Sequence, residues 1–153
     1  MGENVAARTV PVEDILSSTV TIFSSGTDKR PWHINMSVAL DGIKTGKMNA
    51  NDDGMRVAKS VNDVRACSDD EEKKKLKLRL PSVMFAGSFL GREDVDLQKH
   101  SRVIVLDWDD VYAKVRKKPA TLRDELKKHP FILSAWVSPS GDGVKCLACV
   151  AFP

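Results

Sequence analysis

The sequence predicts one α+β domain with a largely antiparallel sheet and helices packed on it. The chain has 153 residues, a length that suits a single hydrophobic core. Its hydrophobic fraction of 42% and charged fraction of 29% are ordinary for a globular protein. Strand-like and helix-like segments are mixed along the chain, and the last two strands are separated by the turn PSGDG, which is typical of an antiparallel hairpin.

The composition also excludes several classes of protein. No window approaches the roughly 20 consecutive apolar residues that cross a bilayer, and the amino end lacks a signal-peptide core. The three cysteines are too few and too scattered for a disulfide framework. We therefore expect a soluble, cytoplasmic protein that makes no contact with membranes. The formal net charge of +3 gives, by itself, little sign of a polyanionic partner.

The first half of the chain divides into an arm and the start of the domain. Residues 1–17 show no sustained period and are predicted as a loose N-terminal arm that has room for one short helical turn, with 18–153 as the domain. The β-branched run Thr19–Ser24 predicts the first strand. A short helix over Asn35–Gly42 is expected to end at Gly42 or Gly46, and Met48–Gly54 has the composition of a surface loop.

Two capping-box patterns predict the next helices. Ser60 and Ser68 each stand three residues before an acidic residue, which favours helices over Val61–Ala66 and Asp69–Arg79. The segment PSVMFAGSF that follows predicts a second strand. Residues Gly91–Gln98 are predicted as an acidic connection.

The second half contains the clearest strand. Arg102–Asp107 has four consecutive apolar residues, which predicts a central strand buried on both faces. A helix is expected to begin at Pro119 and to end before Pro130. Strands over Phe131–Ser138 and Val144–Phe152 complete the sheet. Because the last strand runs to the end of the sequence, we expect a domain that is truncated at its C-terminus.

Two aspartates end the apolar strand. Residues two apart in a strand point to the same side, so Asp107 and Asp109 present their carboxylates together. Such hard oxygen ligands suit Mg²⁺ or Mn²⁺, which take substrate phosphates as further ligands. The alternative is that these aspartates only end a strand, with Asp109 or Asp110 as the N-cap of a short helix.

The sequence SPSGDGVK lies in the last turn. Its two glycines permit positive φ and close backbone approach, so that amides could converge on a phosphate, and Lys145 adds a compact positive charge. The predicted phosphate-binding residues are Ser138, Ser140, Gly141, Gly143 and Lys145. The alternative is a hairpin whose glycines serve the geometry of the turn alone.

Charge is unevenly distributed around the aspartates. Residues 92–110 contain three basic and six acidic residues, a net charge of −3, whereas 112–129 contain seven basic and two acidic residues, a net charge of +5. This charge distribution is the one expected around a metal site that binds a polyanion. The alternative is that the basic segment is only the solvated face of a helix. The predicted nucleic-acid-binding residues are Lys114, Arg116, Lys117, Lys118, Arg123, Lys127 and Lys128.

Other chemically suggestive residues fit structural roles better. Cys146 and Cys149 are three apart in a predicted strand and face opposite sides, which makes them poor zinc ligands and favours reduced, buried thiols. The three histidines share no spacing typical of a metal site. The three tryptophans are predicted in the core or at its rim.

Taken together, these motifs resemble a known family. The run KKLKLRLPSVMFAGSF, the strand SRVIVLDWDDV and the hairpin HPFILSAWVSPSGDGVKCLACV resemble the VirE N-terminal-type domain of mobile-element and phage-like proteins. The resemblance covers about residues 34–150. That domain is in turn similar to the RRM-like catalytic core of the archaeo-eukaryotic primase–polymerases.

The resemblance implies a metal-dependent nucleotidyltransferase. By its motifs, Asp107 and Asp109 match the residues that bind catalytic Mg²⁺ or Mn²⁺, and SPSGDGVK matches the segment that binds the incoming nucleotide. The implied partners are nucleoside triphosphates, a single-stranded DNA template and a helicase domain or protein. The sequence departs from the pattern twice: Lys145 stands where a histidine is common, and no third acidic motif follows it.

Two other functions stay open at this point. One is a non-catalytic module that binds single-stranded nucleic acid or a helicase partner, for which the basic segment alone suffices. The other is a metal-dependent nuclease that uses the same two carboxylates.

Overall fold

The structure is a computed structural model that describes residues 11–47 and 57–150. The loop predicted at Met48–Gly54 and the first ten residues of the predicted arm lie outside these ranges. The elements, in chain order, are α1 (Val12–Leu16), β1 (Thr19–Phe23), β2 (Trp32–Asn35), α2 (Met36–Thr45), α3 (Val57–Ala66), α4 (Asp70–Leu78), β3 (Ser82–Met84), β4 (Gly87–Phe89), the 3₁₀-helix η1 (Asp94–Asp96), β5 (Leu97–His100), β6 (Val103–Trp108), α5 (Val111–Val115), α6 (Pro119–Leu126), β7 (Ile132–Val137) and β8 (Val144–Cys149).

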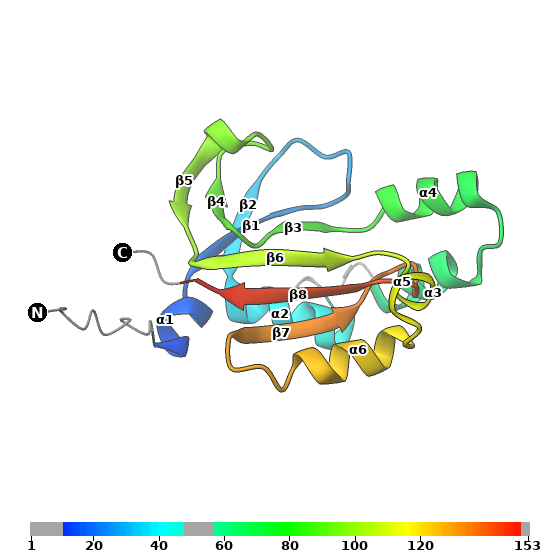
Figure 1. The fold of residues 1–153 in the computed structure, drawn as a ribbon. Coiled ribbons are helices and arrows are strands. Elements are labelled where there is room, and N and C mark those ends of the chain that lie inside the picture. The colour runs from blue at the N-terminus through cyan, green and yellow to red at the C-terminus, as the bar shows by residue number, and fades with distance from the viewer. Residues whose placement is uncertain (1–10, 48–56, 151–153) are drawn as a thin grey trace, which may run out of the picture.

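Within the described residues the strands form three antiparallel sheets, with helices packed on them (Figure 1). Their orders are β2-β1-β3, β4-β5 and β6-β8-β7. The α+β class and the antiparallel pairing predicted from the sequence are therefore confirmed. In the described residues no helix is long and apolar enough to span a membrane.

The main core lies between the first and third sheets and α2. Strand β1 is buried at four of its five positions, and Val20 from β1 packs with Met36 from α2 and Leu147 from β8. Ile15 joins this core from α1 and is only 2% exposed. Within the described residues, the predicted arm thus contains one short helix, α1, and this helix packs on the core.

The segment PSVMFAGSF forms two strands rather than the one strand predicted. Strand β3 pairs with β1, whereas β4 pairs with β5. Thr21 of β1 links the two sheets, because its hydroxyl accepts a hydrogen bond from the Phe89 amide at 2.7 Å and donates one to the Gly87 carbonyl at 3.3 Å. The chain therefore changes sheets at Phe85 and Ala86, a break that continuous apolar character does not reveal.

Strand β6 lies at the edge of its sheet, which corrects the prediction of a central strand. In the described residues it pairs with β8 only. Its side chains Ile104 and Val105 are 41% and 43% exposed. An apolar run predicts burial on both faces, but strand order depends on contacts that are distant in sequence.

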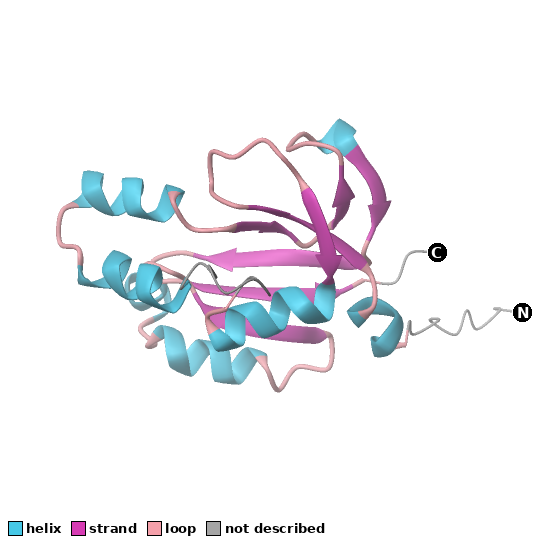
Figure 2. Ribbon diagram, turned by 180° about the vertical axis from the view of Figure 1, so that it is seen from behind, coloured by secondary structure: helices cyan, strands magenta, loops and turns pink. Residues whose placement is uncertain are grey.

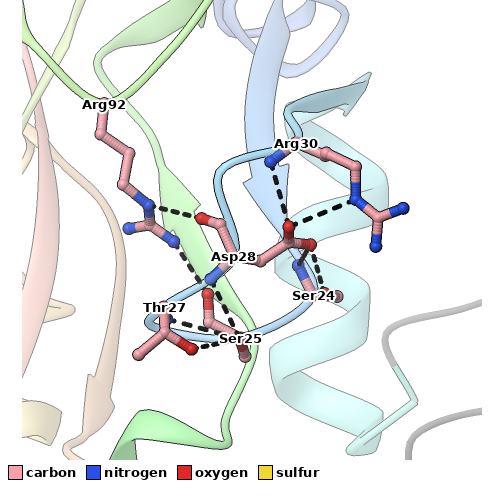
Figure 3. Close-up of polar contacts among 6 residues, drawn as sticks. All are labelled: Ser24, Ser25, Thr27, Asp28, Arg30 and Arg92. Atoms are coloured by element: carbon pink, nitrogen blue, oxygen red, sulfur yellow. Dashed lines mark hydrogen bonds and ion pairs between the residues drawn. The ribbon is translucent and has the colours of Figure 1, made fainter.

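The loop between β1 and β2 is held by a polar cluster (Figure 3). Asp28 accepts hydrogen bonds from the Ser24 hydroxyl and from the Arg30 amide, the latter at 3.0 Å. Arg92 donates to the carbonyls of Asp28 and Ser25, at 2.8 Å each, while its guanidinium lies 3.9 Å from the centroid of the Phe23 ring. These contacts fasten the loop to the segment that follows β4.

Helices α3 and α4 form a hairpin at the end of the third sheet where β6 ends and β8 begins (Figures 1 and 2). The Gly26 amide donates to the Leu78 carbonyl at 2.8 Å, which ties α4 to the β1–β2 loop. The N-cap of α4 is Asp69, whose carboxylate accepts a hydrogen bond from the Glu72 amide at 2.7 Å. The predicted helix is confirmed, but its cap lies one residue after Ser68.

Candidate functional site

A cleft of about 750 Å³ opens between the third sheet, the α3–α4 hairpin and β3. Its lining has an acidic, a basic and an apolar part. Asp107 and Asp109 supply the acidic part, and Ser138, Ser140 and Lys145 from the last hairpin lie beside them. The fold thus brings together two sequence motifs that are about 30 residues apart.

The register of the third sheet explains this juxtaposition. Asp107 on β6 stands directly opposite Lys145 on β8, and Lys145 stands opposite Trp136 on β7. Facing residues in neighbouring strands project from the same side of a sheet. On that side Leu147 packs into the core two residues further along β8, so one sheet face changes from apolar core to polar cleft.

Lys145 and Asp107 form an ion pair across these two strands. The side chains are 31% and 40% exposed, so water screens the attraction. The pair shows that the predicted metal ligand already attracts a cation and that the predicted phosphate ligand already has an anionic partner.

The turn from Ser138 to Gly143 is closed by its own hydrogen bonds. The Ser138 amide donates to the Gly143 carbonyl at 2.9 Å, and the Gly143 amide donates to the Ser138 hydroxyl at 3.1 Å. The Gly141 amide donates to the Ser138 carbonyl at 3.0 Å. The amides of Gly141 and Gly143 are therefore used inside the turn, which corrects the expectation that they converge on a phosphate.

Each glycine nevertheless meets a need of the backbone. Gly141 has a φ of 88°, a backbone conformation that residues with a Cβ atom rarely adopt. A Cβ atom at Gly143 would lie 2.6 Å from the Trp108 carbonyl oxygen and 3.4 Å from the Asp109 carboxylate. The absence of a side chain at Gly143 thus allows the turn to pack against the end of β6 and against Asp109, which follows it.

Asp142 lies in the same turn. The Ser140 hydroxyl donates to the Asp142 carboxylate, and this bond, together with the positive charges of Lys73 and Lys77, holds the pKa of Asp142 below its usual value. Residues four apart on a helix share a face, so α4 turns one basic face towards the hairpin turn.

The sequence reasoning missed three cations of the cleft, Lys44, Arg65 and Lys77. Arg65 on α3 donates from Nη2 to the Ser138 carbonyl at 3.2 Å. None of the three forms an ion pair with the described part of the chain. No local motif marks them, because α2, α3 and α4 reach the cleft only through the tertiary fold.

The apolar part of the cleft includes two aromatic rings. Phe85 and Trp136 both line it, with ring centroids 5.6 Å apart and planes tilted by 54°. Val83 and Val105 lie in the same lining. Trp136 belongs to the rim of the core, as predicted, and it also contributes to this lining.

The seven predicted nucleic-acid-binding residues lie outside this cleft. Arg123 and Lys127 line a neighbouring groove of about 490 Å³ between α2, α6 and β7, and the groove shares Lys44 and Trp136 with the cleft. Lys117 pairs with Glu125 at 2.6 Å and Arg123 with Asp124 at 2.8 Å. The other four, Lys114, Arg116, Lys118 and Lys128, are exposed and line neither cavity.

The carboxylates form a pair and not a closed cage. Within residues 11–47 and 57–150, no group of three or more His, Cys, Asp or Glu side chains is arranged to hold a metal ion. Two carboxylates in an open cleft fit a hard divalent ion whose other ligands are water and phosphate oxygens.

Cys146 and Cys149 are free thiols, and burial raises the pKa of each, as expected of reduced structural cysteines.

The fold and the cleft define an α+β domain with a mixed acidic and basic site. The chain belongs to the family described as BT4734-like, N-terminal domain, whose model matches residues 75–153, just over half of the chain. The matched region begins in α4 and includes both cleft motifs, Asp107–Asp109 and Ser138–Lys145. No curated protein and no solved structure matches the chain.

Proposed function

We propose that this chain is a primase–polymerase-like domain of a mobile-element or phage-type DNA replication protein and that its cleft binds a nucleoside triphosphate for metal-dependent nucleotidyl transfer. The observation that carries the proposal is the convergence of Asp107, Asp109, Ser138, Ser140 and Lys145 on one cleft. The RRM-like core and the likeness to the VirE N-terminal-type domain are part of this proposal. They rest on the motif sequences and not on the family match.

The chemistry of the cleft supports a nucleotide as ligand. Its volume of about 750 Å³ lies in the range of small-molecule sites. Its apolar part, with Phe85 and Trp136, suits a base, while its cations suit phosphates. Asp107 and Asp109 would hold Mg²⁺ or Mn²⁺, and such a metal would neutralise the phosphates and polarise the α-phosphoryl group.

The groove beside the cleft supports the proposed single-stranded DNA template. Arg123 and Lys127 line it, and Trp136 joins it to the cleft. Exposed cations bind the phosphate backbone of a single strand without reading its sequence. A helicase domain or protein is the further partner proposed from the family resemblance.

The first prediction concerns the two carboxylates. Wild-type protein should bind a non-hydrolysable nucleoside triphosphate in the presence of Mn²⁺. The change of Asp107 and Asp109 to Asn should weaken the Mn²⁺-dependent part by at least about tenfold, because loss of even the residues that orient metal ligands costs that much. Isothermal titration calorimetry with and without Mn²⁺ measures this. Incorporation of labelled nucleotides on a single-stranded template measures the transfer step.

Asp110→Asn is the matched control. Asp110 lies next to the pair but does not line the cleft, and its φ of 54° is tolerated by asparagine. The control should bind nucleotide as the wild type does. Nucleotide binding that is independent of Mn²⁺ and of both carboxylates would refute the catalytic proposal.

That same outcome would favour a second candidate, a non-catalytic module that binds single-stranded nucleic acid. The observation behind this candidate is that the described residues contain no group of three or more His, Cys, Asp or Glu side chains arranged to hold a metal ion. Such a module should bind single-stranded DNA equally well with and without Mn²⁺. Cleavage of labelled single strands in the presence of Mn²⁺ would instead indicate a nuclease.

A further inference from the structure

The phosphate ligands predicted from the last hairpin are largely occupied by the protein itself. Lys145 pairs with Asp107, and the Ser140 hydroxyl donates to Asp142. The amides of Gly141 and Gly143 donate within the turn. A polyphosphate in the cleft therefore needs other donors.

We infer that Arg65 of α3 and Lys77 of α4 form a polyphosphate-binding limb of the cleft, supplied by the α3–α4 hairpin. This inference rests on the proposed function, because it assigns the phosphate end of the same cleft. The ligand is the triphosphate of a nucleotide, and the two helices act as the wall against which its outer phosphates lie.

Arg65 has the position and the free donors for this role. A guanidinium carries five N–H donors, and within the described residues Arg65 uses one of them, on the Ser138 carbonyl at 3.2 Å. A side chain at Gly141 would lie 3.6 Å from the Cγ and Nε atoms of Arg65, so the arginine stem crosses the hairpin turn closely. The remaining donors suit bidentate contact with phosphate oxygens.

Lys77 adds a second positive charge from the adjacent helix. It lines the cleft, is exposed and forms no ion pair in the described part of the chain. Its positive charge helps to lower the pKa of Asp142, which lies in the hairpin turn that Arg65 also contacts. The two cations therefore flank the turn from one side while Asp107 and Lys145 line the same cleft.

The balance of charge in the cleft favours a polyanion. The described lining contains four basic side chains, Lys44, Arg65, Lys77 and Lys145, against Asp107 and Asp109. This excess of two positive charges complements a triphosphate that carries one divalent ion. The cleft has the volume of a small-molecule site, which favours a free polyphosphate over a nucleic-acid strand.

The test uses the whole chain and inorganic tripolyphosphate without metal. Wild-type protein should bind tripolyphosphate more tightly than orthophosphate. Arg65→Gln should weaken tripolyphosphate binding by at least about tenfold, since the charge-assisted hydrogen bonds from the guanidinium to phosphate oxygens are lost. Lys77→Gln should weaken it less, and Arg65→Lys should fall between Arg65→Gln and the wild type because lysine keeps the charge but loses the fork.

Arg79→Gln is the matched control. The substitution removes one positive charge at the C-terminus of α4, and Arg79 does not line the cleft. Tripolyphosphate binding measured at the same salt concentration should therefore stay within about twofold of wild type. Circular dichroism and thermal unfolding confirm that each variant is folded. If Arg65→Gln unfolds the chain, Arg65→Lys and Lys77→Gln still carry the test.

The inference is overturned if Arg65→Gln and Lys77→Gln bind tripolyphosphate as the wild type does, or if their loss of binding is equalled by Arg79→Gln. It is also overturned if a 12-nucleotide single strand displaces tripolyphosphate and if binding of that strand depends on Arg65 more strongly than tripolyphosphate binding does.

The double variant Asp107→Asn, Asp109→Asn separates this inference from the proposed function, because it should not weaken metal-free tripolyphosphate binding. Failure of this inference thus leaves Mn²⁺-dependent nucleotide binding intact, whereas failure of the proposed function removes that binding and leaves the tripolyphosphate result.

Discussion

At the scale of single residues, Asp28 is the most strongly perturbed acid of the described chain. The hydrogen bond from the Ser24 hydroxyl, followed by that from the Arg30 amide, lowers the pKa of Asp28 from 3.8 to about 2. Its charged form is therefore favoured in the folded protein. Asp28 organises the loop that Arg92 fastens to the rest of the molecule (Figure 3).

This shift predicts a defined loss of stability in acid. A group whose pKa is lower in the folded state stabilises that state above its unfolded pKa, and the contribution disappears as the pH falls through the folded value. The advantage of wild type over Asp28→Asn should therefore be full above about pH 4 and should shrink between pH 4 and 2. Denaturant midpoints measured across this range test the prediction.

Asp41→Asn is the control for Asp28. The Asp41 side chain takes part in no hydrogen bond or ion pair within the described residues, so its replacement removes no such contact and should change the denaturant midpoint at neutral pH less than Asp28→Asn does. A difference between wild type and Asp28→Asn that is constant from pH 7 to 2 would contradict the assignment of the shift to Asp28.

At the scale of elements, α4 depends on its ends more than on packing. It has no buried residue, so local hydrogen bonds and side-chain pairs hold it. The sequence predicted its position correctly, because the capping-box spacing that marks its start is a local signal. It predicted the cap at Ser68, since the capping-box pattern fits two neighbouring residues and only the backbone path selects Asp69.

We expect Asp69→Ala to destabilise α4 by about 1 kcal/mol, the usual cost of losing an N-cap. Amide hydrogen exchange over the helix should then become about fivefold faster. Ser68→Ala is the control and should change exchange little, because the cap hydrogen bond comes from Asp69. Equal effects of the two substitutions would show that Asp69 is not the cap. Lys77 lies in the last turn of α4 and lines the cleft. Asp69→Ala therefore also tests whether the stability of α4 affects this part of the cleft lining.

Strands were harder to predict than helices, for a physical reason. The position of β7 and β8 followed from the turn between them, which is local. The edge position of β6 and the split at Phe85 depend on which strands meet in space. A run such as Val103–Leu106 has the same sequence pattern in a central strand and at an edge whose side chains stay partly exposed.

At the scale of the whole molecule, the site divides into a predictable and an unpredictable half. Asp107 and Lys145 lie in motifs that the sequence displays, and the register of β6 against β8 brings them together. Arg65 comes from a helix 73 residues before the carbonyl that it contacts, and no spacing in the sequence signals that approach. The roles of all these residues stay predictions until binding is measured.

The whole molecule also separates the basic segment into two parts, which permits a last prediction about the proposed template. Lys127 lines the groove that joins the cleft through Lys44 and Trp136, whereas Lys114 on α5 lies outside both cavities. Lys127→Ala should weaken binding of a single strand and lower the slope of log affinity against log salt by about 0.7, the value for one lost phosphate contact. Lys114→Ala should change neither quantity. Fluorescence anisotropy of a labelled oligonucleotide at several salt concentrations measures both. Equal losses for the two variants would mean that the basic segment attracts DNA as a diffuse charge, and the groove would then have no special part in holding the strand.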